Sequence, residues 1–359
     1  MTESSRLRLF DVALLLFLLA IAAGARVGYL ATYADHAGSS GPFRVQESEP
    51  PADLVGNVRD HHWFGRLTPL AATEERTADV APGYPWLLGE LERLPLQEGS
   101  VPPLVRWLQC VLGTLTAGLY YLFARQAFPG RSVAVLAGLC CALHPFYVIE
   151  TAALNDGTLA AFLLAAAVWL GARGGQVGGP LTSLLYGLAL AALALVRAAL
   201  LPFAVVALLW FLWRSRSLSG GALAAVLAFL GFVTALAPWL IRNFEAFGDV
   251  YPIVDSTYLH LWIGHAPRGD GGPLSERTAV AALAESRGEE PRVTASWLAT
   301  RPPRERDRAL AEAIVAEWQR DAAGALRRRL WEGLYFFCGA DWFTAGRLWQ
   351  DATPDGRAE

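Results

Sequence analysis

The sequence contains no lysine, a single methionine and few charged residues of any kind. All 30 basic residues are arginines, and charged residues make up only 18% of the 359 positions. A soluble globular domain carries about 25% charged residues. The deficit is local, because long stretches have no charge at all, and 54% of the chain is hydrophobic. Together with a mean hydropathy of +0.32, this favours a protein that lies in lipid.

Other absences exclude whole classes of function. The net charge of −3 gives no basic surface for a nucleic-acid partner. The chain lacks the glycine patterns of nucleotide-binding loops, so a cytosolic nucleotide is not expected as its direct substrate. No Cys-x-x-Cys or Cys/His spacing is present, and at least three of the four cysteines fall in apolar runs. We therefore expect no metal and no cofactor.

Apolar runs long enough to cross a bilayer are abundant. A transmembrane helix needs roughly 20 mostly apolar residues. We predict an all-α polytopic membrane protein with seven spans, at about 9–30, 104–123, 133–149, 154–172, 181–196, 198–213 and 220–241. The first could be a signal peptide, since Ala23-Gly24-Ala25 resembles a cleavage site, but the many later spans favour a retained anchor. An eighth candidate, 330–343, is interrupted by two acids.

The run Leu181–Trp213 is too long for one ordinary span and contains one charge, Arg197. Two spans with a turn near Arg197 and Pro202 place the basic residues of all short loops on the side of the N-terminus. That arrangement satisfies the positive-inside rule with the N-terminus in the cytoplasm. It leaves two large non-cytoplasmic loops, 31–103 and 246–329, with short amphipathic helices expected at Tyr84–Leu94 and Arg304–Arg320. The predicted organisation is a membrane core over 1–245, the second outer loop over 246–329 and a polar tail after the eighth candidate, to 359.

Charges at membrane depth are candidates for function. Arg197 lies between two apolar helices, where it is either a snorkelling turn residue or part of an anion site, because a guanidinium suits phosphate. Arg242 ends the seventh span and is either an interfacial anchor or a second cation for that site. Glu150 and Asp156 lie in a short outer turn. Several first-loop acids could act as a general base.

Several segments resemble one family, the C-type membrane glycosyltransferases of glycosyltransferase family 39. These are the relatives of protein mannosyltransferases and of aminoarabinose transferases. The similar segments are Pro82-Gly83-Tyr84-Pro85, His144-Pro145 through Asn155-Asp156, Leu195-Val196-Arg197, Ala237-Pro238-Trp239-Leu240-Ile241-Arg242-Asn243-Phe244, Leu261-Trp262-Ile263-Gly264 and Arg308–Phe337. They occur in the family's order over about residues 8–340.

The resemblance implies a GT-C-like helical bundle that transfers a sugar from a polyprenyl-phosphate carrier, on the non-cytoplasmic face of a bacterial inner membrane, to a protein, lipid or glycan acceptor. By match of segment, Arg197 and Arg242 would hold the lipid phosphate, Asp156 would support the site, and a first-loop acid would be the base. Ser48 stands where the family usually has an aspartate. Glu49 is therefore the expected base, with Glu47 and Asp53 as alternatives.

Two other functions remain open on the sequence. One is an inactive relative that binds a polyprenyl lipid or a partner without transferring sugar. The other is a transporter or flippase, which should show repeated halves and broken helices near the bilayer midplane. The charges gather at the outer ends of the spans and no inverted repeat is evident, so the sequence favours the transferase.

Overall fold

The computed structural model describes residues 3–36, 52–61, 64–67, 74–95, 101–177, 179–216, 220–267 and 276–338. The chain divides into two compact units, Met1–Val254 (unit 1) and Asp255–Glu359 (unit 2). Each unit is described by itself.

Unit 1 is built on seven apolar helices. They are α1 (Glu3–His36), α4 (Val101–Ala127), α5 (Arg131–Leu143), α7 (Gly157–Val177), α8 (Pro180–Val196), α9 (Leu201–Ser215) and α10 (Gly221–Phe247). In the described part of the chain, five segments are long and apolar enough to cross a membrane: Leu9–Thr32, Val101–Ala127, Gly157–Gly174, Ala198–Ser215 and Gly221–Phe247. α5 and α8 are apolar but shorter. The predicted all-α polytopic membrane fold is confirmed.

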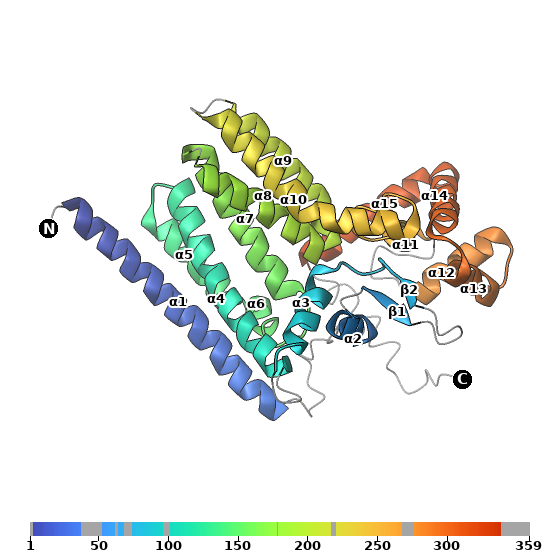
Figure 1. The fold of residues 1–359 in the computed structure, drawn as a ribbon, viewed down its shortest axis with the longest axis horizontal. Helices are drawn as coiled ribbons and strands as arrows, with labels where there is room; N and C mark the ends of the chain where they lie inside the picture. Colours follow the sequence, from blue (N-terminus) through green and yellow to red (C-terminus); the bar gives the residue numbers. More distant parts are fainter. Residues whose placement is uncertain are drawn as a thin grey trace. The chain divides into compact units, whose positions relative to one another are not determined.

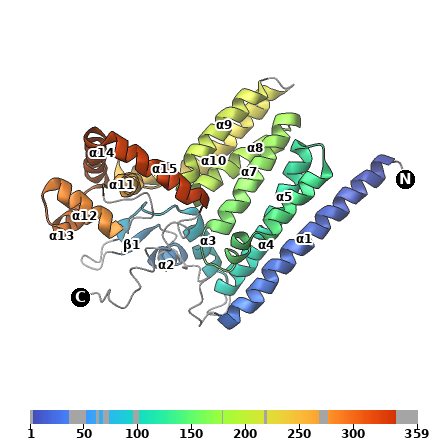
Figure 2. The same ribbon diagram turned by 180° about the vertical axis from the view of Figure 1, so that it is seen from behind.

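The seven helices lie side by side, and the chain runs up one and down the next (Figures 1 and 2). One end of this bundle, the short-turn end, holds the connections from α4 to α5, α7 to α8 and α9 to α10. The other end, the loop end, holds the C-termini of α1, α8 and α10 and the N-termini of α4, α7 and α9. Which end faces the cytoplasm stays a prediction.

The first long loop gathers at the loop end as α2 (Ala52–His61), β1 (Gly65–Leu67), β2 (Glu74–Arg76) and α3 (Gly83–Glu92). The strands pair antiparallel, with Gly65 opposite Arg76. This hairpin was not expected from the sequence. An apolar cluster that includes Leu54, Phe64 and Trp239 packs α2 and the hairpin against the end of α10. The loop is thus fixed to the helices by buried apolar surface.

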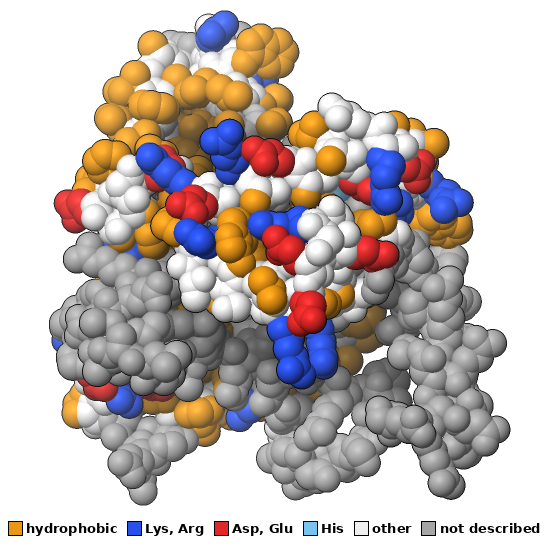
Figure 3. Space-filling view, turned by 90° about the vertical axis from the view of Figure 1, so that its right-hand side faces the viewer, with side chains coloured by type: hydrophobic (Ala, Val, Ile, Leu, Met, Phe, Trp, Pro, Cys, Tyr) orange, Lys and Arg blue, Asp and Glu red, His pale blue; other side chains and the backbone are white. Residues whose placement is uncertain are grey.

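Small residues allow α8 and α10 to pack closely. A Cβ atom at Gly187 would overlap the carbonyl of Ala228, and one at Gly231 would lie against the carbonyl of Leu184. Membrane helices gain most of their association from such contacts, because lipid tails are as apolar as leucine. Leucines and phenylalanines face outward instead, as on α9, where Val206 and Leu209 are exposed. Figure 3 shows hydrophobic side chains gathering at the top of the view, the height at which Figure 1 draws α9 and α10.

The expected third span, 133–149, is not one continuous helix. α5 ends at Leu143, His144 is extended with φ −62° and ψ 120°, and Pro145 begins the short helix α6 (Pro145–Ile149). The residue before a proline is disfavoured in the α conformation, which explains the break. α7 then begins at Gly157, three residues later than the expected start at 154.

The run 181–213 is divided at Arg197. α8 ends at Val196, Arg197 is extended with φ −137° and ψ 96°, and a short 3-10 turn (Ala198–Leu200) leads into α9. Pro202 lies in the first turn of α9, where its missing N–H costs nothing. The backbone of Arg197 thus lies outside both helices at the loop end.

Unit 2 consists of helices α11 (Thr257–His265), α12 (Glu276–Arg287), α13 (Pro291–Thr300), α14 (Pro303–Arg320) and α15 (Ala322–Cys338). α14 covers the charged helix expected at Arg304–Arg320. The core of unit 2 includes Trp262, Ala279, Leu283 and Leu310. The eighth candidate span falls on the end of α15, and its last residues, 339–343, lie outside the described part of the chain.

Candidate functional site at the loop end

The turn between α6 and α7 carries Asp156 at the start of α7. The backbone N–H of Ala152 bonds the carbonyl of Ile149 at 3.0 Å, which continues the α6 turn. The side-chain oxygen of Asn155 then accepts the N–H of Gly157 at 2.9 Å. Such a side-chain hydrogen bond satisfies one of the backbone N–H groups that have no partner within the first turn of a helix. Asp156 is therefore fixed to a structured helix start.

Two polar residues of α4 hold this turn. Arg106 Nε donates to the carbonyl of Ala152 at 2.9 Å, and Gln109 Nε2 donates to the carbonyl of Ala153 at 2.9 Å. Gln109 is only 2% exposed. Neither residue was predicted from the sequence, although polar side chains three positions apart at the start of an apolar span were a visible signal. Their role is to position the turn, since each bonds a carbonyl that the turn leaves free.

Arg197, just after the C-terminus of α8, forms an ion pair with Asp156, just before the N-terminus of α7. The distance from Arg197 Nε to Asp156 Oδ2 is 3.3 Å, and the terminal nitrogen of Arg197 lies 3.5 Å from Asp156 Oδ1. The side chain of Arg197 is 51% exposed, against 28% for Asp156. The acid therefore orients the guanidinium, while about half of the Arg197 side chain stays exposed.

The segment Pro82-Gly83-Tyr84-Pro85 lies directly against this turn. A Cβ atom at Gly83 would meet Val196 Cγ2 at 2.7 Å and the carbonyl of Leu195 at 3.0 Å. Only glycine allows the N-terminus of α3 to approach the end of α8 so closely. The structure thus brings two segments that carry the family resemblance, 82–85 and 195–197, into contact beside Arg197.

Arg242 has different partners from Arg197. Its guanidinium lies 4.8 Å from the ring centre of Trp239 and 5.7 Å from that of Phe247. It donates to the carbonyl of Phe64 and, at 2.9 Å, to the side-chain oxygen of Asn243. Aromatic faces attract a guanidinium, so these contacts fix its position. Both arginines lie at the loop end, but their joint hold on one phosphate stays a prediction.

The expected base falls outside the described part of the chain. Glu47 and Glu49 precede Ala52, and although Asp53 belongs to α2, its side chain is not described. Among the described first-loop acids, Asp60 pairs with Arg59 at 2.7 Å. Its hydrogen bond raises the pKa of Arg59. Asp79 accepts a hydrogen bond from Thr77 at 2.8 Å. Which carboxylate faces the arginines stays a prediction.

Two charges inside the first span were not singled out from the sequence. Arg26 is fully buried and donates to the carbonyls of Ala22 at 3.0 Å and Ala142 at 3.1 Å. It therefore satisfies a carbonyl freed where α5 breaks. Asp11 pairs with Arg125 at 3.2 Å and Arg131 at 2.9 Å at the short-turn end. Both had the same signal: an ionised residue in an apolar run.

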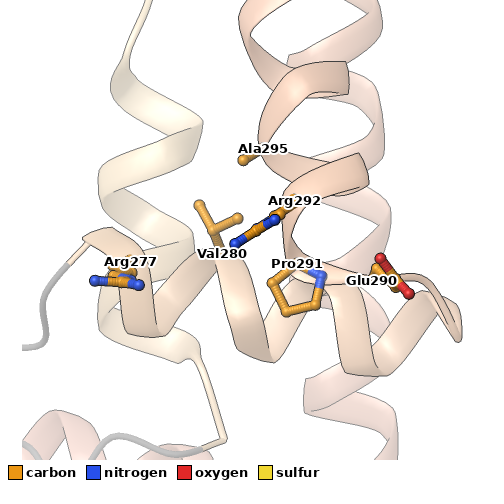
Figure 4. Close-up of a pocket in the computed structure, with 6 residues that line it drawn as sticks. All are labelled: Arg277, Val280, Glu290, Pro291, Arg292 and Ala295. Carbon is orange, nitrogen blue, oxygen red and sulfur yellow. The ribbon is translucent and has the colours of Figure 1, made fainter. Parts of the chain in front are cut away.

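Unit 2 contains cavities of its own. One of about 790 Å³ lies between α12 and α13 and is lined by Arg277, Val280, Glu290, Pro291, Arg292 and Ala295 (Figure 4). Another of about 720 Å³ has Trp262 and Leu283 among its apolar lining residues and Arg287 and Glu312 among its charged ones. Both mix apolar and ionic groups, and neither contains a sequence-predicted site residue. Within the described residues, no group of three His, Cys, Asp or Glu side chains is arranged to hold a metal.

Comparison with known families gives a match over part of the chain. Residues 79–241 match the family model of dolichyl-phosphate-mannose-protein mannosyltransferase. This segment of the chain is similar to that family. The match supports a membrane glycosyltransferase of the C type and covers a little under half of the sequence. No curated protein and no solved structure matches the chain.

The matched segment contains the geometry described above. It includes the start of α3, the turn held by Arg106 and Gln109, and the Asp156–Arg197 pair, and it ends one residue before Arg242. The candidate bases Glu47, Glu49 and Asp53 precede it. The mannosyltransferase relationship therefore rests on the bundle and its loop end.

Proposed function

We propose that the protein transfers a sugar from a polyprenyl-phosphate carrier to an acceptor, at the loop end of the unit 1 bundle. The observation that carries this proposal is the half-exposed side chain of Arg197, whose guanidinium is oriented by Asp156 within the segment that matches the mannosyltransferase family. A polyprenyl chain is apolar and its phosphate is anionic. A cation at the end of a membrane helix bundle meets both requirements.

The reaction needs two groups from the protein. The acceptor oxygen or nitrogen attacks the anomeric carbon, the bond from that carbon to the phosphate oxygen breaks, and the phosphate leaves with the electron pair. A carboxylate takes the acceptor's proton, and inversion at the anomeric carbon follows from a single displacement. Positive charge must stabilise the leaving phosphate, where it counts most in the transition state.

We assign these roles to residues at the loop end. Arg197 contacts the phosphate through the face that Asp156 leaves open, and Arg242 supplies a second cation. Asp156 keeps the guanidinium in orientation. Glu49 is the proposed base, with Glu47 and Asp53 as alternatives on the same loop. A carboxylate displaced by about 1 Å can cost on the order of a hundredfold in rate, so the choice among them matters.

The sidedness follows from the arginines at the short-turn end. Arg125, Arg131, Arg173, Arg214 and Arg216 all lie near the connections there. By the positive-inside rule this end faces the cytoplasm, and so does the N-terminus. The loop end then faces outward in a bacterial inner membrane, and the acceptor is a protein, lipid or glycan on that side.

The test compares two arginines at opposite ends of the bundle. The purified protein is reconstituted with polyprenyl-phosphate mannose, and membrane extracts supply acceptors while released polyprenyl phosphate is measured. Arg197→Ala should lower release by a factor of about 100 or more, as for loss of one donor to a transition-state anion. Arg173→Ala is the matched control, because Arg173 lies at the short-turn end, over the Trp169 ring.

Binding separates the transferase from an inactive relative. The wild-type chain should bind polyprenyl phosphate more tightly than the neutral polyprenyl alcohol, and Arg197→Ala should remove that preference. A retained preference with no release from any carrier sugar or acceptor tried would favour an inactive lipid-binding protein. Equal binding of phosphate and alcohol by the wild-type chain would refute the phosphate site.

A further inference from the structure

The last described helix, α15, carries Arg328 on the side that packs against the rest of unit 2. Arg328 is 7% exposed and pairs with the buried carboxylate of Glu317 at 2.9 Å. Glu317 also accepts Arg320 at 2.6 Å. Arg328 further donates to the carbonyl of His265 at 3.4 Å. A carboxylate on α14 therefore neutralises Arg328, and a backbone carbonyl on α11 accepts a hydrogen bond from it.

The outward face of α15 is apolar. Leu326, Leu330 and Leu334 recur every four residues, so they lie along one face of the helix, and they are 54%, 64% and 46% exposed. Trp331, beside them, is 39% exposed. A helix at a water-facing surface normally shows the opposite pattern, with leucine inside and arginine outside. Arg328 and the three leucines of α15 show the inverse of this pattern.

A lipid surface suits this inverted helix better than water does. Exposed leucines in a contiguous stripe mark a contact with lipid or protein. Arg327 is exposed one residue after Leu326, so its charge can reach lipid phosphates while its stem covers apolar surface. Tryptophan is enriched at the level of lipid headgroups. Charge complementarity therefore selects a bilayer with anionic headgroups as the occupant.

We propose that α15 lies in the plane of the membrane surface and seats unit 2 on the bilayer through Leu326, Leu330, Trp331 and Leu334. The described helix, Ala322–Cys338, lacks the roughly 20 mostly apolar residues of a span, because Arg327, Arg328 and Arg329 lie within it and their charges would have to enter hydrocarbon. The described part of the eighth candidate span, 330–338, then belongs to an interfacial helix. This proposal does not depend on the transfer reaction.

Depth measurements on the full chain test the orientation. Nitroxide labels are placed singly at positions 326, 330 and 334 after the four native cysteines are replaced, and the protein is reconstituted in vesicles of phosphatidylcholine with phosphatidylglycerol. Each label should show higher access to oxygen and lower access to a nickel chelate than a control label at Arg308. The Arg308 side chain is 82% exposed on α14. The three depths should agree, at about 5–10 Å below the phosphates.

Three outcomes would overturn the proposal. Depth that increases steadily from 326 to 334, by about 1.5 Å per residue, indicates a helix that crosses the bilayer. Nickel access equal to that of the Arg308 label indicates a face in water. Access to neither reagent indicates a protein partner or a second copy on this face.

A measurement on the unchanged sequence guards against misfolding of the labelled variants. A photoreactive phosphatidylcholine, with its reactive group near the headgroup, should label peptides of α15 several-fold more than peptides of α14. Equal labelling of the two helices would contradict the proposal. Vesicles of phosphatidylcholine alone should give weaker labelling than vesicles with phosphatidylglycerol, and no difference would remove the role given to Arg327.

Discussion

Two clusters of arginine and aspartate lie at opposite ends of the unit 1 bundle, and they use the same chemistry differently. At the short-turn end, Asp11 is shared by Arg125 and Arg131, and the three side chains are 27%, 26% and 36% exposed. At the loop end, the one ion pair of Asp156 among the described residues is with Arg197, and the side chain of that arginine is 51% exposed. The first cluster joins three helices, α1, α4 and α5. The second joins the ends of α7 and α8.

The difference separates a structural contact from a candidate binding group. A carboxylate that pairs with two arginines uses both of its oxygens and connects the helices that carry them. An ion pair between a single acid and a half-exposed arginine contributes little to the free energy of unfolding, as is usual for exposed pairs. Its value lies in presenting an oriented cation to an anionic ligand. The comparison therefore predicts stability effects at one end of the bundle and functional effects at the other.

Replacing Asp11 by alanine should have the largest effect on stability. The change leaves Arg125 and Arg131 without their shared acid, and we expect a loss of about 2 kcal/mol, since breaking a partly buried pair costs less than the roughly 3–5 kcal/mol of a fully buried one. Thermal unfolding in detergent measures it. Glu312→Ala is the control, because it removes the acid of an exposed pair on α14. Equal melting shifts for the two variants would contradict the structural role.

Asp156→Asn should affect turnover more than stability. Without the charge, Arg197 loses its orientation, and we expect release of polyprenyl phosphate to fall about tenfold, which corresponds to about 1.4 kcal/mol. Binding of polyprenyl phosphate should not weaken, because the amide no longer competes for the guanidinium. A melting shift as large as that of Asp11→Ala, with unchanged turnover, would reverse the assignment of the two clusters.

Gln109→Leu tests whether the loop end depends on its support from α4. The substitution removes a bond to the carbonyl of Ala153 in a buried place. We expect a loss of about 1 kcal/mol in stability, together with a fall in turnover, because the turn that carries Asp156 loses a contact. Thr114→Val is a fair comparison on the same helix, since the Thr114 hydroxyl donates to the carbonyl of Cys110 in its own helix. If both variants behave alike, Gln109 does not position the turn.

Salt should give the smallest effect and should act at one end only. Raising the salt from about 0.05 to about 0.5 M shortens the screening length severalfold. The preference for polyprenyl phosphate over the alcohol should fall by a factor of a few, because Arg197 is exposed. The melting temperature of wild-type protein should change little, since the Asp11 cluster is partly shielded. An unchanged preference across this range would indicate a more buried phosphate site than Arg197 can provide.

Much of the bundle followed from the sequence because lipid imposes simple demands. A long apolar run must be helical to satisfy its own backbone, and this made the polytopic all-α fold predictable. The break at Arg197 was reached from the distribution of arginines, without any geometric information. The break at His144 was also encoded, because Pro145 follows it, but apolar composition concealed it.

The site was less accessible to sequence reasoning. Asp156 and Arg197 are separated by 41 positions, and nothing in the pattern shows that their side chains meet. The supports from Arg106 and Gln109 depend on which face of α4 looks toward the turn. The hairpin of β1 and β2 is too short, at three residues per strand, to leave a clear alternation. Tertiary packing fixes each of these features.

The buried guanidinium of Arg26 has a consequence for the order of assembly. Its partner carbonyl on Ala142 lies 116 residues further along the chain, so at a synthesis rate of about 5–20 residues per second that partner emerges roughly 6–23 s later. During that interval the Arg26 guanidinium can donate to the carbonyl of Ala22 in its own helix but not to that of Ala142. In the nascent protein the hydrogen bonding of Arg26 is therefore incomplete until α5 has been synthesised.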